Sequence, residues 1–361
     1  MTTGRDFWAG RSVLITGNTG FKGTWLSFWL THMGARVTGM SLPPEKDPGH
    51  TALSITNDQV KTYFVDIRDP EPVSACIEAA RPNVVFHMAA QALVRPSYQD
   101  PVGTYATNVM GTVHVLEAIR EHGGVEAVVV VTSDKCYENR EWPWAYREDE
   151  AMGGYDPYSS SKGCAELVAS AYRRSFFTGP DKTLCRVATA RAGNVIGGGD
   201  WSTDRLVPDM IRSMSDGTSI EIRSPGAVRP WQHVLEPLSG YVRLAETLVS
   251  PQGGGYAEAW NFGPAEDDCR PVSYLVEKVT QAWGEGARWH LSEKVQPHEA
   301  HFLKVDSSKS RARLDWNRRM SLERTLEWTV EWYRRQRAGE KPQSLTLEQI
   351  ERYEQLAGVQ A

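Results

Sequence analysis

The residues Thr132-Ser133-Asp134-Lys135-Cys136-Tyr137 place a hydroxyl, a carboxylic acid and an amine side by side at the end of an apolar run. Tyr158 and Lys162 follow downstream, four positions apart. On a helix this spacing puts both side chains on one face, where the lysine charge favours the phenolate and lowers a tyrosine pKa that starts near ~10. We expect Ser133 to hydrogen-bond the same substrate hydroxyl as Tyr158, and Thr132 to be a buried strand residue.

Asp134 and Lys135 distinguish this pattern from a simple hydride-transfer site. A dehydrogenase or an epimerase gains nothing from an acid and an amine beside the hydroxyl, whereas the elimination of water needs both an acid and a base. Oxidation of C4 of a hexose to a ketone makes the C5 proton acidic, so a base can remove it while an acid protonates the departing C6 hydroxyl. Each such step typically contributes ~10²–10⁴-fold. The pattern predicts an enzyme that oxidises a sugar and dehydrates it; the plainer interpretation is an Asp–Lys pair solvated at a strand end.

A glycine-rich turn, Gly17-x-x-Gly20-x-x-Gly23, directly follows an apolar run at 12–16 and precedes a helical segment. The missing Cβ atoms let the backbone turn tightly and approach a pyrophosphate, which then lies at the helix N-terminus. The spacing differs from G-x-G-x-x-G and is typical of short-chain dehydrogenases. Asp66, at a strand end, could accept a hydrogen bond from an adenine amino group or could instead cap a turn.

The end of the second expected strand bears on the choice of cofactor. An acidic residue there normally holds the ribose 2′-hydroxyl of NAD. In this chain the position falls near Ser41-Leu42-Pro43, so the acid is missing and no arginine is present for a 2′-phosphate. We choose NAD over NADP, and no metal is expected.

Apolar, β-branched runs alternate with helical segments over the first half of the chain. Strands are expected at 12–16, 35–40, 63–65, 84–89, 127–131 and 183–191, and helices at 24–33, 72–80, 104–122 and 158–176. This alternation predicts an α/β fold of Rossmann type, a doubly wound parallel sheet with helices on both faces.

The character of the sequence changes past Asn194, where glycines at 197–199 and several prolines separate shorter segments. We expect residues 1–193 to form the NAD-binding domain, with a return segment near 228–260. Residues 194–227 and 261–361 would form a smaller substrate-binding region. Near the end, 321–334 predicts a helix, and Thr346-x-x-Gln349 is a candidate capping box for a last one.

Composition excludes several classes of protein. The 361 residues are 40% hydrophobic and 24% charged with a formal net charge of −5, which indicates a soluble globular chain and gives no sign of nucleic-acid or membrane partners. No run of about 18 apolar residues occurs, and 1–11 lacks the apolar core of a signal peptide, so we expect a cytoplasmic protein. The cysteines are odd in number and form no C-x-x-C, which predicts reduced thiols: Cys76, Cys136, Cys164, Cys185 and Cys269.

Taken together, these residues resemble the CDP-D-glucose 4,6-dehydratase family of extended short-chain dehydrogenases/reductases, over almost the whole chain. The motifs that carry the resemblance lie at 13–17, 86–91, 108–111, 132–137, 154–158, 191–201, 229–233 and 298–301. The last three are the most specific, because a generic member of the class would not be expected to contain them.

The resemblance implies a role for each residue of the catalytic group. Tyr158 takes the O4 proton as C4 delivers hydride to NAD, and Ser133 and Lys162 assist. Asp134 protonates the departing C6 hydroxyl. Lys135 stands where the dTDP-glucose relatives carry glutamate, the base for the C5 proton. Since a lysine must be neutral to act as a base, its pKa would have to fall well below ~10.4.

The resemblance also implies two sets of binding residues. A guanidinium suits a pyrophosphate because it offers several donors in a fixed fork, and Pro230 and Trp231 give Arg229 a stiff setting. The residues implied for the sugar nucleotide are Asn194, Arg205, Arg229 and His301. Those implied for NAD are Gly17, Thr19, Gly20, Phe21, Lys22, Gly23, Asp66, Ile67, Ala89, Ala90, Gln91, Asn108, Tyr158 and Lys162.

The implied product is CDP-4-dehydro-6-deoxy-D-glucose, used in deoxysugar and O-antigen synthesis. Helices at 104–122 and 158–176 pair across the dimer in relatives, so a homodimer or homotetramer is expected. The alternatives are a 4,6-dehydratase or an epimerase acting on another nucleotide sugar, since no base-reading pattern is visible. A non-catalytic NAD-sensing regulator usually lacks the tyrosine or the lysine, and both are present here.

Overall fold

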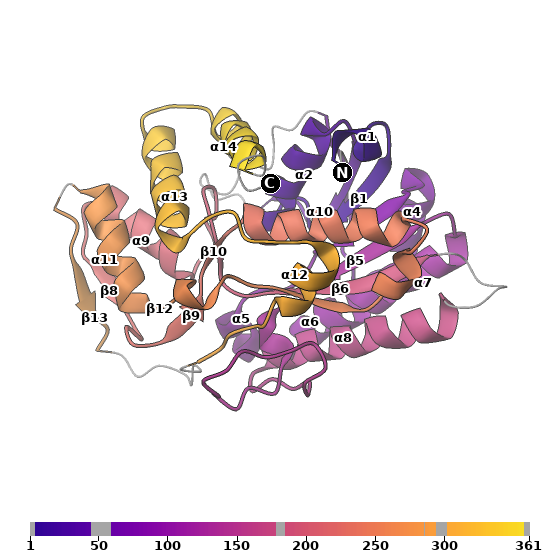
Figure 1. Ribbon diagram of the computed structural model, residues 1–361, viewed down its shortest axis with the longest axis horizontal. Coiled ribbons are helices and arrows are strands. Elements are labelled where there is room, and N and C mark those ends of the chain that lie inside the picture. Colours follow the sequence, from indigo (N-terminus) through magenta and orange to yellow (C-terminus); the bar gives the residue numbers. More distant parts are fainter. Residues whose placement is uncertain (1–3, 45–58, 178–184, 285, 294–301, 357–361) are drawn as a thin grey trace.

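The structure is a computed structural model that describes residues 4–44, 59–177, 185–284, 286–293 and 302–356. Its centre is a seven-stranded sheet of order β11-β6-β5-β4-β1-β2-β3 in which every neighbouring pair is parallel (Figure 1). The order reverses between β1 and β4, as in doubly wound dinucleotide-binding sheets, and this confirms the predicted fold class. The strands are β1 (Ser12–Thr16), β2 (Arg36–Ser41), β3 (Lys61–Phe64), β4 (Val84–His87), β5 (Ala127–Val131), β6 (Arg186–Ala192) and β11 (Ala259–Phe262).

Helices cover both faces of this sheet because its central strands are apolar on both sides. In β1, Val13 and Ile15 pack with Trp25 of one face, whereas Leu14 packs with Ile77 of the other. The first face is covered by α2 (Phe21–His32) and α10 (Leu235–Val249). The second is covered by α4 (Pro70–Ala80), α7 (Gly111–His122) and α8 (Pro157–Phe176).

The long helix expected at 104–122 is assembled from three segments. They are α6 (Pro101–Tyr105), the π-helical turn η1 (Ala106–Met110) and α7. The helix expected at 158–176 is confirmed as α8. It begins after Asp156, whose side chain accepts a hydrogen bond from the backbone N–H of Ser159 at 2.9 Å and so caps the helix.

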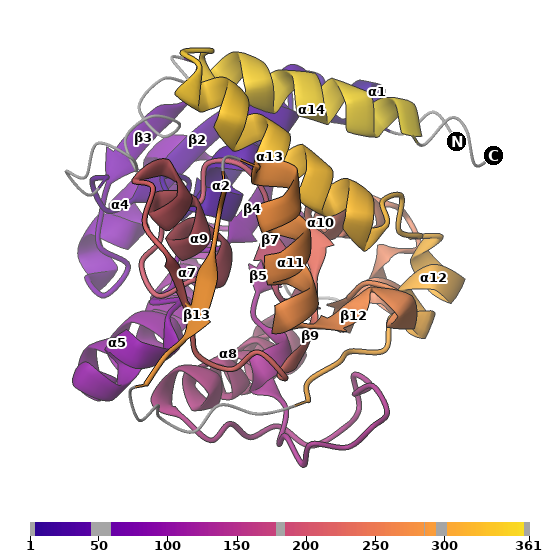
Figure 2. The ribbon, with the colours of Figure 1, turned by 90° about the vertical axis from the view of Figure 1, so that its left-hand side faces the viewer.

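A smaller group of elements lies beside the carboxyl ends of the central strands, on the left of Figure 1 and facing the viewer in Figure 2. Strand β8 pairs with β13 in parallel, and β9 pairs with β12 in antiparallel fashion. The chain returns to the main sheet in between, through α10 and β11, and β11 spans the domain boundary predicted at 260. The elements of the group are α9 (Leu206–Ser215), β8 (Ile220–Ile222), β9 (Val228–Pro230), β12 (Cys269–Pro271), α11 (Val272–Trp283) and β13 (Trp289–Leu291).

The C-terminal segment crosses back over the first face of the sheet as α12 (Ser308–Leu314), α13 (Leu322–Arg337) and α14 (Pro342–Leu356). Helix α13 confirms the helix expected at 321–334. The predicted capping box is wrong, because α14 begins at Pro342 and Thr346 is fully buried within it. The Thr346 hydroxyl accepts a hydrogen bond from Trp332 Nε1 at 3.2 Å instead, so this side chain joins α14 to α13.

The remaining elements are short. They are α1 (Arg5–Trp8), α5 (Val94–Gln99), β7 (Val195–Ile196), β10 (Gln232–His233), and the 3-10 turns η2 (Asp134–Cys136), η3 (Gly253–Tyr256) and η4 (Glu266–Asp268). Strands β7 and β10 pair in parallel where the chain leaves the large sheet for the smaller group.

Candidate active site

A cleft of about 1550 Å³ runs along the carboxyl ends of the central strands and on beneath the smaller group of elements. Ligands of open α/β sheets bind in this crevice, where the strand order reverses. Its walls come from the glycine-rich turn, the ends of β2, β4 and β5, the first turns of α8, and the segments at 192–196, 200–209 and 220–229.

The glycine-rich turn lines one end of the cleft and admits no side chain at two of its glycines. Gly17 has a φ of +74°, and a Cβ there would lie 2.8 Å from Ala89 Cα. A Cβ on Gly23 would lie 2.1 Å from the carbonyl oxygen of Gly17. The turn therefore packs backbone against backbone and opens the N-terminus of α2 toward the cleft, which is the arrangement that a pyrophosphate requires. The residues present fit a dinucleotide.

Beside this turn, the ends of β2 and β3 form the next part of the wall. Ser41 Oγ and Thr19 Oγ1 share a hydrogen bond of 2.6 Å at the position where an acidic residue was missing from the sequence. Asp66 caps its own turn by accepting the N–H of Arg68 at 2.9 Å, and it pairs with the Arg68 guanidinium at 2.6 Å. That hydrogen bond to the guanidinium is the main reason why the pKa of Asp66 is lowered. Asp66 lines the cleft as a charged carboxylate and caps its turn, and its contact with an adenine amino group stays a prediction.

Asn108 is placed differently from the other residues expected to bind the cofactor. It is buried and is not among the described residues that line the cleft. Its Nδ2 donates to the Gln91 carbonyl at 2.9 Å and to Ser161 Oγ at 2.8 Å, while its Oδ1 accepts the Gln91 N–H at 2.9 Å. Asn108 fixes the backbone of Gln91, which does line the cleft, against α8, and its contact with the cofactor stays a prediction. The other predicted cofactor residues all line the cleft.

The catalytic candidates come together at the carboxyl end of β5. Ser133 Oγ donates to Asp134 Oδ1 at 3.0 Å and accepts the N–H of Lys135 at 3.2 Å, which closes the 3-10 turn η2. Tyr158, in the first turn of α8, also interacts with the Ser133 hydroxyl. Lys162, one turn further along, donates to the Val131 carbonyl at 3.3 Å. The serine thus stands between the carboxyl of Asp134 and the phenol of Tyr158.

Burial dominates the electrostatics of Asp134. Its side chain is 2% exposed, and burial raises its pKa, although Lys135, Ser133 and Arg229 act in the opposite direction. Oδ2 has no hydrogen-bond partner among the residues that the structure describes. A carboxyl that keeps its proton in a buried site is suited to act as a general acid.

Tyr158 and Lys162 are buried as well. Burial raises the pKa of Tyr158 to about 12, against the effect of its hydrogen bond with Ser133. This direction is opposite to the lowering expected from the sequence. The physical reason is that desolvation of the phenolate is the larger effect. Burial lowers the pKa of Lys162 to about 8, and the charge of Glu166 raises it in part.

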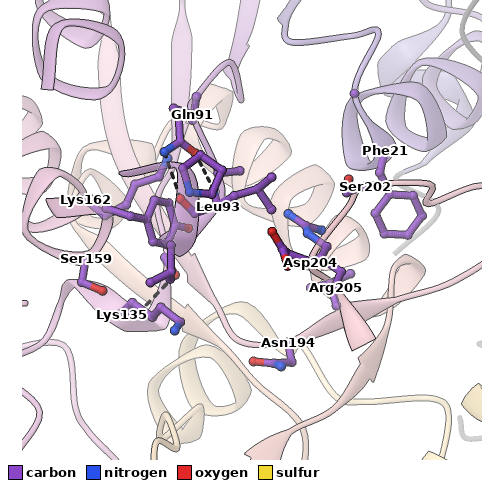
Figure 3. A pocket seen from close by; sticks show the side chains of 18 of the residues that line it. Phe21, Gln91, Leu93, Lys135, Ser159, Lys162, Asn194, Ser202, Asp204 and Arg205 are labelled. Carbon is purple, nitrogen blue, oxygen red and sulfur yellow. Dashed lines mark hydrogen bonds between the residues drawn. The ribbon is translucent and has the colours of Figure 1, made fainter. Parts of the chain in front are cut away.

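Three of the four residues expected at the sugar nucleotide line the cleft; the fourth, His301, lies outside the described residues. Arg229 is 5% exposed, and Arg205 Nη1 pairs with Asp200 Oδ2 at 3.2 Å. Figure 3 shows Arg205 on the side of the cleft opposite to Lys162 and Lys135, with Asn194 between them. The spacing of these groups leaves the middle of the cleft to a ligand.

A set of ion pairs in the same wall was not predicted from the sequence. Arg223 Nη2 pairs with Asp204 Oδ1 at 2.9 Å, and Arg95 Nη1 approaches the same oxygen at 3.4 Å. Lys22 was expected only at the cofactor. Burial and the charges of Arg205 and Lys162 lower its pKa to about 7. The charged residues at 200–209 were a usable signal, whereas Arg95 lies more than a hundred positions away in the chain.

The described ranges contain neither a membrane-spanning helix nor a cluster of metal ligands. None of the helices there combines the length and the apolar character that crossing a bilayer requires. In that part of the chain no three His, Cys, Asp or Glu side chains gather in a way that could hold a metal ion.

The parallel sheet, the glycine-rich turn and the Ser–Tyr–Lys group at its carboxyl edge define a dinucleotide-binding protein of the extended short-chain dehydrogenase/reductase class. The family model described as GDP-mannose 4,6 dehydratase matches residues 14–329. The chain belongs to this family.

The known proteins that are similar to this chain include 4,6-dehydratases and an epimerase of nucleotide sugars. CDP-glucose 4,6-dehydratase of Salmonella typhimurium is 52% identical over 332 residues, which cover 91% of this chain and 92% of the relative. dTDP-glucose 4,6-dehydratase of Streptomyces antibioticus is 28% identical over 92% of this chain and 95% of its own. Among solved structures, a dTDP-glucose 4,6-dehydratase of Streptomyces venezuelae with NAD bound superposes with a TM-score of 0.77 at 22% identity, covering 92% of this chain and 99% of that one. A UDP-glucose 4-epimerase of Thermus thermophilus with NAD gives 0.75 at 23% identity, covering 89% and 98%.

Proposed function

We propose that this chain is a CDP-D-glucose 4,6-dehydratase that converts CDP-glucose to CDP-4-dehydro-6-deoxy-D-glucose. The observation that carries the proposal is the buried Asp134, which shares the Ser133 hydroxyl with Tyr158. An acid in that position has no task in a plain oxidation and is required for the loss of water. The 52% identity to a CDP-glucose 4,6-dehydratase over most of both chains supports the same reaction and the same nucleotide.

NAD is the proposed cofactor. The turn at Gly17 and Gly23 fits a pyrophosphate, no arginine at the end of β2 offers a partner for a 2′-phosphate, and relatives of the same fold were solved with NAD. Held by the glycine-rich turn and by Lys162, NAD would supply the hydride acceptor for C4 and the hydride donor for C6. Fluorescence titration with NAD and NADP tests the choice, and tighter NADP binding would reverse it.

The residues of the chain divide the proton transfers among them. Tyr158 takes the O4 proton, while Ser133 donates a hydrogen bond to that oxygen and the Lys162 charge lowers the cost of the phenolate. Asp134 gives its proton to the departing C6 hydroxyl. Lys135 is the proposed base for the C5 proton.

Arg205, Arg229 and Asn194 are proposed to hold the nucleotide diphosphate, together with His301. The two guanidinium groups line the cleft beyond the catalytic group, where the sugar nucleotide must extend away from C4. Arginine suits this position because its donors match the oxygens of a phosphate in pairs.

One experiment separates this function from the alternatives. The purified protein is incubated with CDP-, dTDP-, UDP- and GDP-glucose side by side, and the 4-keto product is read by its absorbance in alkali. We expect product with CDP-glucose above the other three. Product with a different nucleotide would assign another 4,6-dehydratase, and isomerisation without the alkaline absorbance would assign an epimerase.

A homodimer or homotetramer in the cytoplasm is proposed for the assembly. Large apolar side chains are exposed along α6, η1 and α8, with Val102 78% and Leu167 60% exposed, beside Met110 and Phe176. Exposed apolar area of this kind is typical of contact surfaces. Light scattering of the wild type should give a dimer or larger, and Leu167→Glu should shift it toward monomer; a monomeric wild type would contradict the proposal.

A further inference from the structure

The turn that carries Ser133, Asp134 and Lys135 is held at both ends by one buried ion pair. Before the turn, the Thr132 hydroxyl donates to Glu166 Oε1 at 2.5 Å. After the turn, the Tyr137 hydroxyl accepts from Arg191 Nη1 at 2.7 Å. Glu166 and Arg191 are themselves paired, with Nε–Oε1 and Nη2–Oε2 distances both of 2.9 Å, and their side chains are 5% and 3% exposed.

Every charged atom of this pair has its partners. Glu166 Oε1 accepts from Thr132 and Arg191, and Oε2 accepts from Thr189 at 2.6 Å and again from Arg191. The Tyr137 hydroxyl donates its own hydrogen bond to Asn261 Oδ1 at 2.7 Å. A buried ion pair is costly unless it is satisfied in this way, and a satisfied one fixes a single arrangement of the groups around it.

The same carboxylate also belongs to the helix that presents the oxidation residues. Glu166 follows Lys162 by four positions and Tyr158 by eight, so the three side chains lie along one face of α8. Through Thr132, Glu166 ties that helix face to the strand end that leads into Ser133. Neither Glu166 nor Arg191 is among the described residues that line the cleft, so they act on the reaction through the groups that do.

We propose that Glu166, Arg191 and Tyr137 form a positioning network that sets the elimination residues Asp134 and Lys135 against the oxidation residues Tyr158 and Lys162. The inference rests on the dehydratase function proposed above. Different members of the network hold the two ends of the turn. Glu166 holds the start of the turn to the oxidation helix, and Arg191 with Tyr137 holds the end of the turn, beyond Asp134 and Lys135.

Removal of the Tyr137 hydroxyl is the mild test. Tyr137→Phe keeps the ring but breaks the bonds to Arg191 and Asn261. This removes the side-chain anchor at the far end of the turn, while the backbone bonds of Cys136 and Glu138 there and the Thr132–Glu166 contact stay in place. Elimination should slow more than C4 oxidation does. A misplacement of about 1 Å can cost ~10²-fold, so we expect kcat to fall by about tenfold to a hundredfold with little change in KM. In a single turnover with CDP-glucose, the absorbance of reduced nicotinamide should rise and persist, whereas in the wild type we expect it to decay as the product forms.

Two further readouts distinguish positioning from general loss of structure. Hydrogen exchange of the peptide that contains 133–137 should quicken in Tyr137→Phe while that of α8 stays as in the wild type. Tyr353→Phe is the matched control: it also removes a fully buried tyrosine hydroxyl, bonded to Ser239 at 3.1 Å, outside the lining of the cleft. That variant should leave the reduced-nicotinamide signal and the turn unchanged.

Glu166→Gln tests the other end of the network. Loss of the carboxylate charge removes the influence that raises the pKa of Lys162, so the alkaline limb of kcat should move to lower pH. If this variant does not fold, Tyr137→Phe alone decides.

A fall of kcat in Tyr137→Phe without retained reduced nicotinamide would overturn the proposal, as would the same signal in Tyr353→Phe. These outcomes are distinct from failure of the proposed function, which would appear as a wild type that makes no 4-keto product from any of the four nucleotide sugars.

Discussion

The hydroxyl of Ser133 donates a hydrogen bond of 3.0 Å to the carboxyl of Asp134. Tyr158 interacts with the same hydroxyl from the first turn of α8. An acid and a phenol that share one small neighbour can reach O4 and the C6 hydroxyl of a single hexose, two groups separated by C5, which is the geometry that oxidation at C4 and loss of water at C6 both require.

Asp134→Asn should separate these two steps. The amide keeps the size of the side chain and can still accept from Ser133, but it has no acidic proton to give to the C6 oxygen. Product formation should fall by ~10²–10⁴-fold. C4 oxidation should continue, visible as reduced nicotinamide in a stopped-flow trace. Tyr158→Phe is the comparison and should block both steps. Product within a few-fold of the wild type in Asp134→Asn would remove this residue from the acid role.

Lys135→Ala tests the proposed C5 base. If Lys135 removes that proton, solvent deuterium should no longer enter C5 and turnover should drop by ~10²-fold or more. Mass spectrometry of the recovered sugar nucleotide measures the exchange. Lys61→Ala, on the rim of the sheet at β3, is a control that removes an amine far from η2. Exchange that persists in Lys135→Ala would assign the base to another residue.

The pH dependence of kcat/KM should reflect the ionisation of Lys162. Its pKa in the folded protein is lowered to about 8 by burial, so its charge is present below that value and is lost as pH rises through it. Because the ammonium supports the Tyr158 phenolate, kcat/KM should decline above about pH 8. Lys162→Arg, which keeps its charge throughout, should have lower activity but no such decline. Unfolding midpoints measured over the same range separate titration from denaturation, and a wild-type profile flat to about pH 10 would contradict the assignment.

Arg229→Ala should weaken the substrate complex. A hydrogen bond to a charged group is worth about 1.5–3 kcal/mol, which corresponds to a KM increase of roughly 10- to 150-fold with a smaller effect on kcat. Arg270, which faces Arg229 across the β9–β12 pair and is exposed outside the cleft lining, gives the control. Arg270→Ala should leave KM unchanged. An unchanged KM in Arg229→Ala would remove this guanidinium from the substrate site.

Because of Glu236, we expect the free energy of unfolding to depend on pH independently of catalysis. Glu236 is 2% exposed in α10, and burial raises its pKa from 4.5 to about 7, although the N–H groups of Arg319 and Met320 donate to it. A raised value means that its contribution to stability is present below about pH 4.5 and is lost as pH rises through about 7.

Glu236→Gln should remove that loss, which amounts to about 3 kcal/mol at pH values above 7. Urea unfolding near pH 6 and near pH 8 measures it: the variant should gain on the wild type at the higher pH. Glu246, whose pKa burial also raises to about 7, stays in both proteins and leaves part of the dependence in place. The exposed Glu351→Gln is the control and should follow the wild type. Equal slopes in all three proteins would show that Glu236 titrates normally.

Local patterns in the sequence were sufficient to predict the fold class. The apolar runs of β1 and β5 and the glycine spacing at 17–23 depend on neighbours a few positions away, as does the Tyr158–Lys162 pair on α8, so they are legible from sequence. The return of β11 to the sheet is harder to predict from the sequence, because a four-residue strand carries little periodicity and its place is fixed by packing against β6.

Residue types and their spacing establish which chemical groups this protein brings to the carboxyl edge of its sheet. Folding establishes how those groups behave: that burial raises the pKa of Tyr158, that Asn108 supports the backbone of Gln91, and that Arg95 and Arg223 meet at Asp204. Desolvation and long-range proximity are properties of the folded surroundings, and no spacing along the chain encodes them.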